Sequence, residues 1–150
     1  MAAALSMSVS KWFCVFMLAV PVLVLAGCRD PDEKENERLR TAVERVHDKA
    51  MARIGYMFEL NTELKTRAAD CAAVTAQKIE ADIAALEAAD RAMFDWMHQY
   101  QSLFVDEDIR IDNQYRRVQL TLISEVGRLT EDAISAAEQT RAACQSKGQP

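Results

Sequence analysis

The stretch CAAVTAQKIEADIAALEAADRAMFDWMHQY, residues 71–100, decides the fold class. It contains neither proline nor glycine, and its commonest residue is alanine, the strongest helix former. Its larger apolar residues recur mostly every three or four positions, at Val74, Ile79, Ile83, Leu86, Met93, Met97 and Tyr100. That spacing predicts an amphipathic helix, with Asp70 as its N-cap. A second set of residues on this helix is small enough to let neighbouring helices approach closely: Ala81, Ala84, Ala85, Ala88, Ala89 and Ala92.

A similar pattern lies on either side of this stretch. On the N-terminal side, Asp30, Pro31 and Glu33 suit the start of a helix. Its apolar stripe is Leu39, Val43, Val46, Ala50, Ile54, Met57, Phe58 and Leu64. On the C-terminal side, acidic residues 106–108 precede a third helix, where the helix dipole favours negative charge. Its apolar stripe is Tyr115, Val118, Leu122, Val126, Leu129, Ala133, Ala136 and Ala137.

These three segments predict an all-α chain. Each helix would have about 30–35 residues, and their stripes bury most simply in an elongated up-down-up three-helix bundle. The junctions fall in residues 60–70 and 102–112. Residues 60–70 hold neither glycine nor proline, so one continuous helix through that junction remains an alternative.

The first 28 residues have the composition of an export signal. Lys11 is their only charge, an apolar run follows from Trp12 to Leu25, and small residues precede Cys28. The run is too short for a transmembrane helix, which needs about 20 apolar residues. An ordinary signal or anchor with a cysteine at this place by chance is the alternative.

The sequence Leu25-Ala26-Gly27-Cys28 resembles the lipobox of bacterial lipoproteins. The resemblance implies cleavage after Gly27, a covalent diacylglyceryl and N-acyl lipid on Cys28, and no other cofactor. It divides the chain into a lipoprotein signal peptide, residues 1–27, and a helical bundle domain, residues 28–150. By the sorting rule of enteric bacteria, Arg29 after the cysteine favours the outer over the inner membrane. The implied address is therefore the bacterial cell envelope, with the membrane as a partner through the lipid anchor.

Charge and cysteine usage fit that address. The full chain carries a net charge of −5, and loss of Lys11 with the signal makes it −6, which excludes a basic nucleic-acid footprint. Once Cys14 is removed and Cys28 is lipidated, Cys71 and Cys144 remain in an oxidising compartment. In an antiparallel hairpin of the second and third helices these two residues come level, which predicts a disulfide. Two free thiols are the alternative.

Candidate metal ligands are few. Glu44 and His47, and likewise Asp95 and His98, have the acid-x-x-His spacing of di-iron bundles, but the two motifs differ in height by roughly 13 Å along the predicted helices. His47, Met51, Met97 and His98 form an alternative thioether and imidazole set for copper(I). Methionine at helical spacing is more commonly a core residue, so the principal prediction is no metal site.

Residues 93–100, MFDWMHQY, concentrate aromatic rings and thioethers within two turns. They resemble a Trp-Met-His segment of small helical bacterial lipoproteins of unassigned function, and the resemblance implies no activity. Helical spacing places Met93, Met97 and Tyr100 in the core and Phe94 and Trp96 at least partly outside it, as a partner-binding surface. Packing of these rings against the first helix and the following loop is the alternative.

No motif for catalysis is present: there is no glycine-rich phosphate loop, no serine elbow and no available cysteine–histidine pair. Acids such as Glu80, Asp82 and Glu87 are predicted on solvated faces, paired with Lys78 and Arg91. The sequence therefore predicts a non-enzymatic, lipid-anchored envelope protein with a structural, adaptor or protein-binding role. The alternative is a periplasmic lipoprotein that binds a metal or small ligand through its histidines and methionines.

Overall fold

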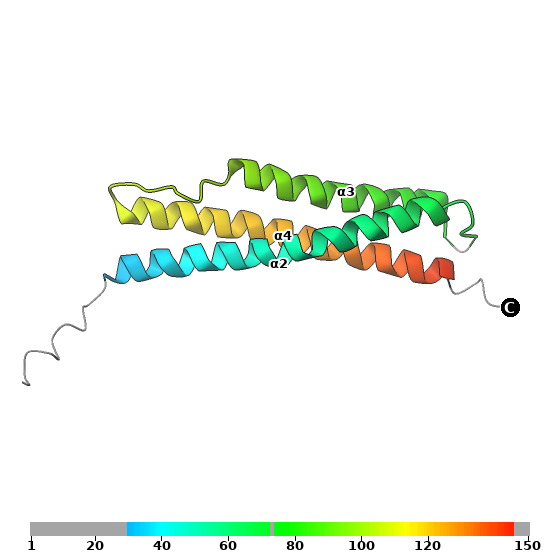
Figure 1. Ribbon diagram of the computed structural model, residues 1–150, viewed down its shortest axis with the longest axis horizontal. Coiled ribbons are helices and arrows are strands. Elements are labelled where there is room, and N and C mark those ends of the chain that lie inside the picture. The colour runs from blue at the N-terminus through cyan, green and yellow to red at the C-terminus, as the bar shows by residue number, and fades with distance from the viewer. Residues whose placement is uncertain (1–29, 73, 146–150) are drawn as a thin grey trace, which may run out of the picture. The chain divides into compact units, whose positions relative to one another are not determined.

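The computed structural model describes residues 30–72 and 74–145. The signal peptide, the lipobox and Cys28 lie outside the described residues. Three helices pack against one another: α2 (Pro31–Arg67), α3 (Ala76–Gln99) and α4 (Ile109–Gln145). In Figure 1, α2 and α4 run in the same direction, and α3 runs alongside them in the opposite direction. The all-α fold and its up-down-up order are confirmed, and no described helix is both long and apolar enough to cross a membrane.

The residues at which the helices begin and end account for their lengths. The start of α2 at Pro31 is confirmed, and α2 and α4 have 37 residues each. Helix α3 has only 24 residues and starts at Ala76, so the prediction of Asp70 as its cap was wrong. Thr75 caps it instead, because the Thr75 side chain accepts a hydrogen bond from the Lys78 amide. The chain therefore breaks between α2 and α3, and a continuous helix is excluded.

The buried positions of α3, and those of α4 apart from Asn113 and Ile134, follow three-four spacing, the heptad pattern of packed helices. On α3 they are Ile79, Asp82, Leu86, Ala89, Met93 and Trp96. On α4 the heptad series is Asp112, Arg116, Gln119, Ile123, Val126, Thr130, Ala133, Ala137 and Thr140. Several of these positions are polar, which is why a stripe drawn through apolar letters alone deviated from the true core face.

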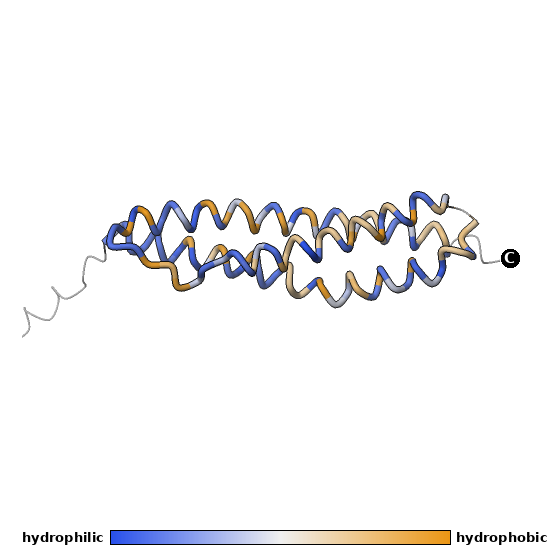
Figure 2. Tube along the Cα trace, turned by 90° about the horizontal axis from the view of Figure 1, so that it is seen from above, coloured by the Kyte–Doolittle hydropathy of each residue, from blue (hydrophilic) through white to orange (hydrophobic). Residues whose placement is uncertain are grey.

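That deviation accounts for the wrong core assignments. Five residues of the predicted stripes are exposed: Phe58 at 74%, Val118 at 50%, Leu122 at 49%, Leu129 at 39% and Met97 at 38%. The predicted alanine flank of α3 is also mostly exposed, since Ala81, Ala84, Ala85 and Ala88 face solvent and only Ala89 is fully buried. Figure 2 shows the resulting alternation of hydrophobic and hydrophilic turns along the helices.

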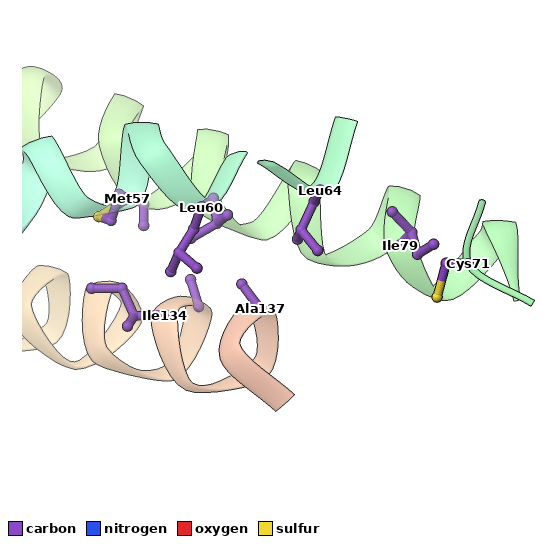
Figure 3. Close-up of a cluster of buried hydrophobic side chains, with 10 residues drawn as sticks. Met57, Leu60, Leu64, Cys71, Ile79, Ile134 and Ala137 are labelled. Carbon is purple, nitrogen blue, oxygen red and sulfur yellow. The ribbon is translucent and has the colours of Figure 1, made fainter. Parts of the chain in front are cut away.

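The core consists of two clusters of buried side chains, and the partly buried Ile54 packs against both of them. One cluster of buried side chains joins all three helices near the α2–α3 connection, with Met57, Leu60 and Leu64 from α2 against Ile79 from α3 and Ile134 from α4 (Figure 3). A second cluster, nearer the start of α2, holds Val43, Ala50, Met93, Trp96, Ile123 and Val126.

A disulfide closes the end of the bundle at which α2 connects to α3. Cys71 and Cys144 are bonded, with their Cα atoms 5.0 Å apart and 73 positions apart in sequence. Cys71 lies in the α2–α3 connection and not at the start of a helix as predicted, whereas Cys144 lies in the last turn of α4. The predicted pairing of Cys71 with Cys144 is confirmed.

Candidate functional site

The aromatic segment at the end of α3 continues into a ladder of four rings. Trp96 stacks on Tyr100 with ring centroids 4.6 Å apart, and Tyr100 lies parallel to Tyr115 of α4 at 6.4 Å. Phe104, from the α3–α4 connection, stacks on Tyr115 at 4.4 Å. The Tyr115 hydroxyl also accepts a hydrogen bond from the Gln101 amide at 2.7 Å. The ladder thus fixes the path of residues 100–108 against the end of the bundle, because offset ring pairs stabilise one geometry.

A small cleft opens beside this ladder, between α2 and α3. It encloses about 250 Å³ and is lined by Val43, Glu44, His47, Trp96, Met97, Tyr100 and Ser102. We call it the aromatic cleft. The His47 ring tilts toward Trp96 at 5.7 Å between centroids, and His47 Nδ1 lies 3.0 Å from an Asp48 carboxylate oxygen. The exposed side chain of Glu44 stands at the cleft, so one acid, one imidazole and one thioether border a wall of stacked rings.

Two polar atoms on that wall are buried without a hydrogen-bond partner among the described residues. They are Trp96 Nε1 and the Tyr100 hydroxyl oxygen. Burial raises the pKa of the Tyr100 hydroxyl, and the positive charge of Arg116 partly opposes that shift. An unpaired buried donor costs free energy, so the Trp96 N–H is buried at a cost to the stability of the core. The groups that the aromatic cleft itself offers to a ligand are the Glu44 carboxylate, the His47 imidazole and the Met97 thioether beside the stacked rings.

The structure corrects the predicted partner-binding pair. Trp96 is only 7% exposed, so its placement outside the core was wrong, whereas Phe94 is 42% exposed as expected. Met93 is fully buried, Tyr100 is partly buried, and Met97, predicted in the core, is 38% exposed. The reason is the heptad spacing of α3, in which Trp96 follows Met93 by three residues and displaces Met97 from the core face.

The alternative metal set is only partly assembled. His47 and Met97 line the aromatic cleft together. Met51 packs beside the second hydrophobic cluster, and His98 is exposed and does not line the cleft. Within residues 30–72 and 74–145 no group of three or more His, Cys, Asp or Glu side chains is placed to hold a metal ion.

A buried polar cluster between α2 and α4 escaped the sequence analysis. Arg116 is 4% exposed; its Nε donates to Asn36 Oδ1 at 3.1 Å and its Nη2 to the Phe104 carbonyl at 3.2 Å. Asn113 donates to the Asp32 carbonyl at 3.1 Å. These bonds tie α2, the connection and α4 together at one end. The available signal was the polar residues at heptad positions 112, 116 and 119, which a search for apolar letters passes over.

Comparison of the chain with protein-family models, with curated proteins and with solved structures gives no match.

Proposed function

We propose that this chain is a lipid-anchored protein of the bacterial envelope that binds a protein partner and catalyses no reaction. The lipobox at residues 25–28 supports the anchor, with Cys28 as the lipidated residue and the outer membrane as the favoured address. The bond between Cys71 and Cys144 supports an oxidising compartment, because disulfides persist there. The partner surface is the α3–α4 connection together with Phe94 and Met97 of α3.

One observation carries the partner-binding role. Leu103 is 89% exposed and Val105 is 80% exposed, although both are large and apolar. Phe104 between them is held by its stack on Tyr115 and by the hydrogen bond from Arg116 to its carbonyl. The connection therefore displays two apolar side chains from a fixed backbone. Fixed, exposed apolar side chains are typical of protein-binding surfaces, because little ordering entropy opposes association.

The test is a photo-reactive amino acid placed at position 103 of the full chain in cells. We expect a discrete covalent adduct with one envelope protein, and we expect Val105→Asp to reduce its yield at least tenfold. Position 62, an exposed residue of α2 near the other end of the bundle, serves as the matched control and should give no such adduct. Equal, diffuse labelling from positions 62 and 103 would overturn the proposal.

The imidazole of His47 and the thioether of Met97, which line the aromatic cleft together, favour a second candidate function, the binding of a metal or small ligand there. Copper(I) and zinc(II) are the probes, since imidazole and thioether groups accept them. If this candidate is right, one of the ions raises the melting temperature, and His47→Ala or Met97→Ala abolishes the rise. His98→Ala, outside the cleft, should retain it. Melting that neither ion changes would exclude this metal-binding role.

A further inference from the structure

A row of exposed apolar side chains follows the outer side of α4. Its members are Ile111, Val118, Leu122 and Leu129, exposed by 47%, 50%, 49% and 39%. Their spacings of seven, four and seven residues place them on one face of the helix, beside the heptad positions that fill the bundle core. We call this row the α4 seam. Isolated exposed apolar residues are ordinary, but four in register along one helix resemble the contact face of a helix pair.

The spacing of the α4 seam is symmetric about position 120. If two copies of α4 lie antiparallel with residue 120 of each at the same height, Ile111 stands opposite Leu129 of the second copy. Val118 then stands opposite Leu122 of the second copy, and both contacts occur twice by symmetry. Every member of the row thereby meets an apolar side chain, which no other antiparallel register achieves.

The charges of α4 favour the same direction. The exposed charges of residues 109–121 are both positive, Arg110 and Arg117, because Asp112 and Arg116 are buried in the bundle. Residues 122–138 carry −3, from Glu125, Glu131, Asp132 and Glu138 against Arg128.

An antiparallel pair sets the positive half of each helix beside the negative half of the other. A parallel pair in register would instead bring Glu125 onto Glu125 and Asp132 onto Asp132, next to the seam. Such contacts between like charges select against a partner orientation.

We propose that the α4 seam binds a second copy of this chain, with the two α4 helices antiparallel. The seam from Ile111 to Leu129 is about 27 Å long at 1.5 Å per residue. Its four apolar side chains from each copy fall short of the roughly 800 Å² per partner of a standard stable interface. The dimer is therefore weak, and it is a separate feature from the partner surface at Leu103 and Val105.

The decisive experiment is cysteine cross-linking of the full chain with a short bismaleimide, in cells that produce two tagged copies. Ile111→Cys in one copy and Leu129→Cys in the other should give a covalent dimer carrying both tags, at least five times more than either variant alone. Ser124→Cys, exposed on another face of α4, replaces Ile111→Cys as the matched control and should give only background. Cross-linking of Ile111→Cys with itself as the main product would indicate a parallel pair and overturn the proposal.

A second measurement tests whether the cross-link arises from a specific contact or from random collisions between copies. Leu122→Glu should reduce the cross-link between positions 111 and 129 at least fivefold, while Leu103→Glu, in the α3–α4 connection, should leave it unchanged. Circular dichroism of both variants should show wild-type helicity, because both side chains are largely exposed. An adduct whose mass differs from twice that of the chain would assign the α4 seam to another protein and overturn the proposal.

Discussion

At the scale of single residues, two neighbours on α3 show how finely the packing discriminates. Trp96 is buried and stacks on Tyr100, whereas Met97 beside it is 38% exposed at the aromatic cleft. Both are large and apolar, so hydrophobicity alone does not distinguish them. The register of α3 against α2 and α4 determines that Trp96 is buried and Met97 is exposed.

Trp96 gives the most direct test of that register. In a chain with Trp12→Phe, Trp96 is the one remaining tryptophan. We expect blue-shifted emission and weak acrylamide quenching, because the indole is shielded from water. Trp96→Ala should destabilise the fold by about 3–5 kcal/mol, as such changes do in protein cores. The control moves the reporter to Phe94→Trp in a Trp96→Phe background, where strong quenching is expected. Strong quenching of Trp96 itself would contradict its burial.

Asp82 is the residue whose environment departs most from expectation. It was predicted on a solvated face, yet it is 4% exposed. Its pairing with Lys78 is confirmed, at 2.5 and 2.6 Å, and Thr140 of α4 donates to the same carboxylate at 2.6 Å. The carboxylate thus links α3 to α4 at a heptad position.

Asp82→Asn should therefore destabilise the bundle by about 2 kcal/mol, since it weakens charge-assisted hydrogen bonds that replace water. Thermal unfolding followed by circular dichroism measures the loss. Glu80→Gln is the matched control on an exposed face of the same helix and should stay within about 0.5 kcal/mol of wild type. Equal effects of the two substitutions would show that Asp82 is not a structural link.

At the scale of elements, the start of α4 depends on one acid. Asp108 precedes the helix and accepts a hydrogen bond from the Arg110 amide at 3.0 Å, and its carboxylate also holds the Arg110 guanidinium at 2.7 Å. The side-chain bonds from Arg110, followed by the bond from its amide, lower the pKa of Asp108 from 3.8 to about 2. The charged carboxylate therefore stabilises the folded helix end.

The sign of the pH effect follows from that lowered pKa. The stabilisation is fully present above the unfolded value, 3.8, and is lost as the pH falls toward about 2. Asp108→Asn should lower the melting temperature modestly at pH 7, and the difference from wild type should shrink to nothing near the acid end of that window. Glu59→Gln, at an exposed position of α2, serves as the control and should give no such convergence. A difference that persists unchanged below the window would refute the role of the Asp108 charge.

At the scale of the whole bundle, covalent and non-covalent ties close opposite ends. The disulfide joins the α2–α3 connection to the last turn of α4. At the other end, Arg116 and Asn113 bond to α2 and to the α3–α4 connection. Each end of a long, narrow bundle exposes much surface for its core, so fixing both ends limits fraying.

Replacing both Cys71 and Cys144 by alanine should cost about 4 kcal/mol, because the loop of 73 residues is no longer closed in the unfolded chain. The melting temperature should fall by roughly 10 °C or more for a domain of this size. Reduction of the wild-type chain with dithiothreitol should reproduce the fall, and the alanine variant should not respond to dithiothreitol. A variant that melts with the oxidised wild type would refute the stabilising role.

The sequence by itself determined the number of helices, their order and the pairing of Cys71 with Cys144. Helical periodicity, the absence of proline between positions 31 and 150, and the hairpin register are local or nearly local properties, so they can be read without coordinates. The start of α2 at Pro31 belongs to the same class, because the fixed proline φ suits a first helical turn.

Only the tertiary structure decided which face of each helix is buried. Asp82 and Arg116 occupy core positions because each finds hydrogen-bond partners on another helix, which no letter in the sequence reveals. Leu122 and Leu129 lie at the surface instead, because α4 has more apolar residues than its narrow buried face can hold. The α4 seam results from that surplus of apolar residues, and the aromatic cleft is bordered by Met97, which is exposed on α3 in the same way. Both candidate sites therefore depend on packing that forms only when three helices meet.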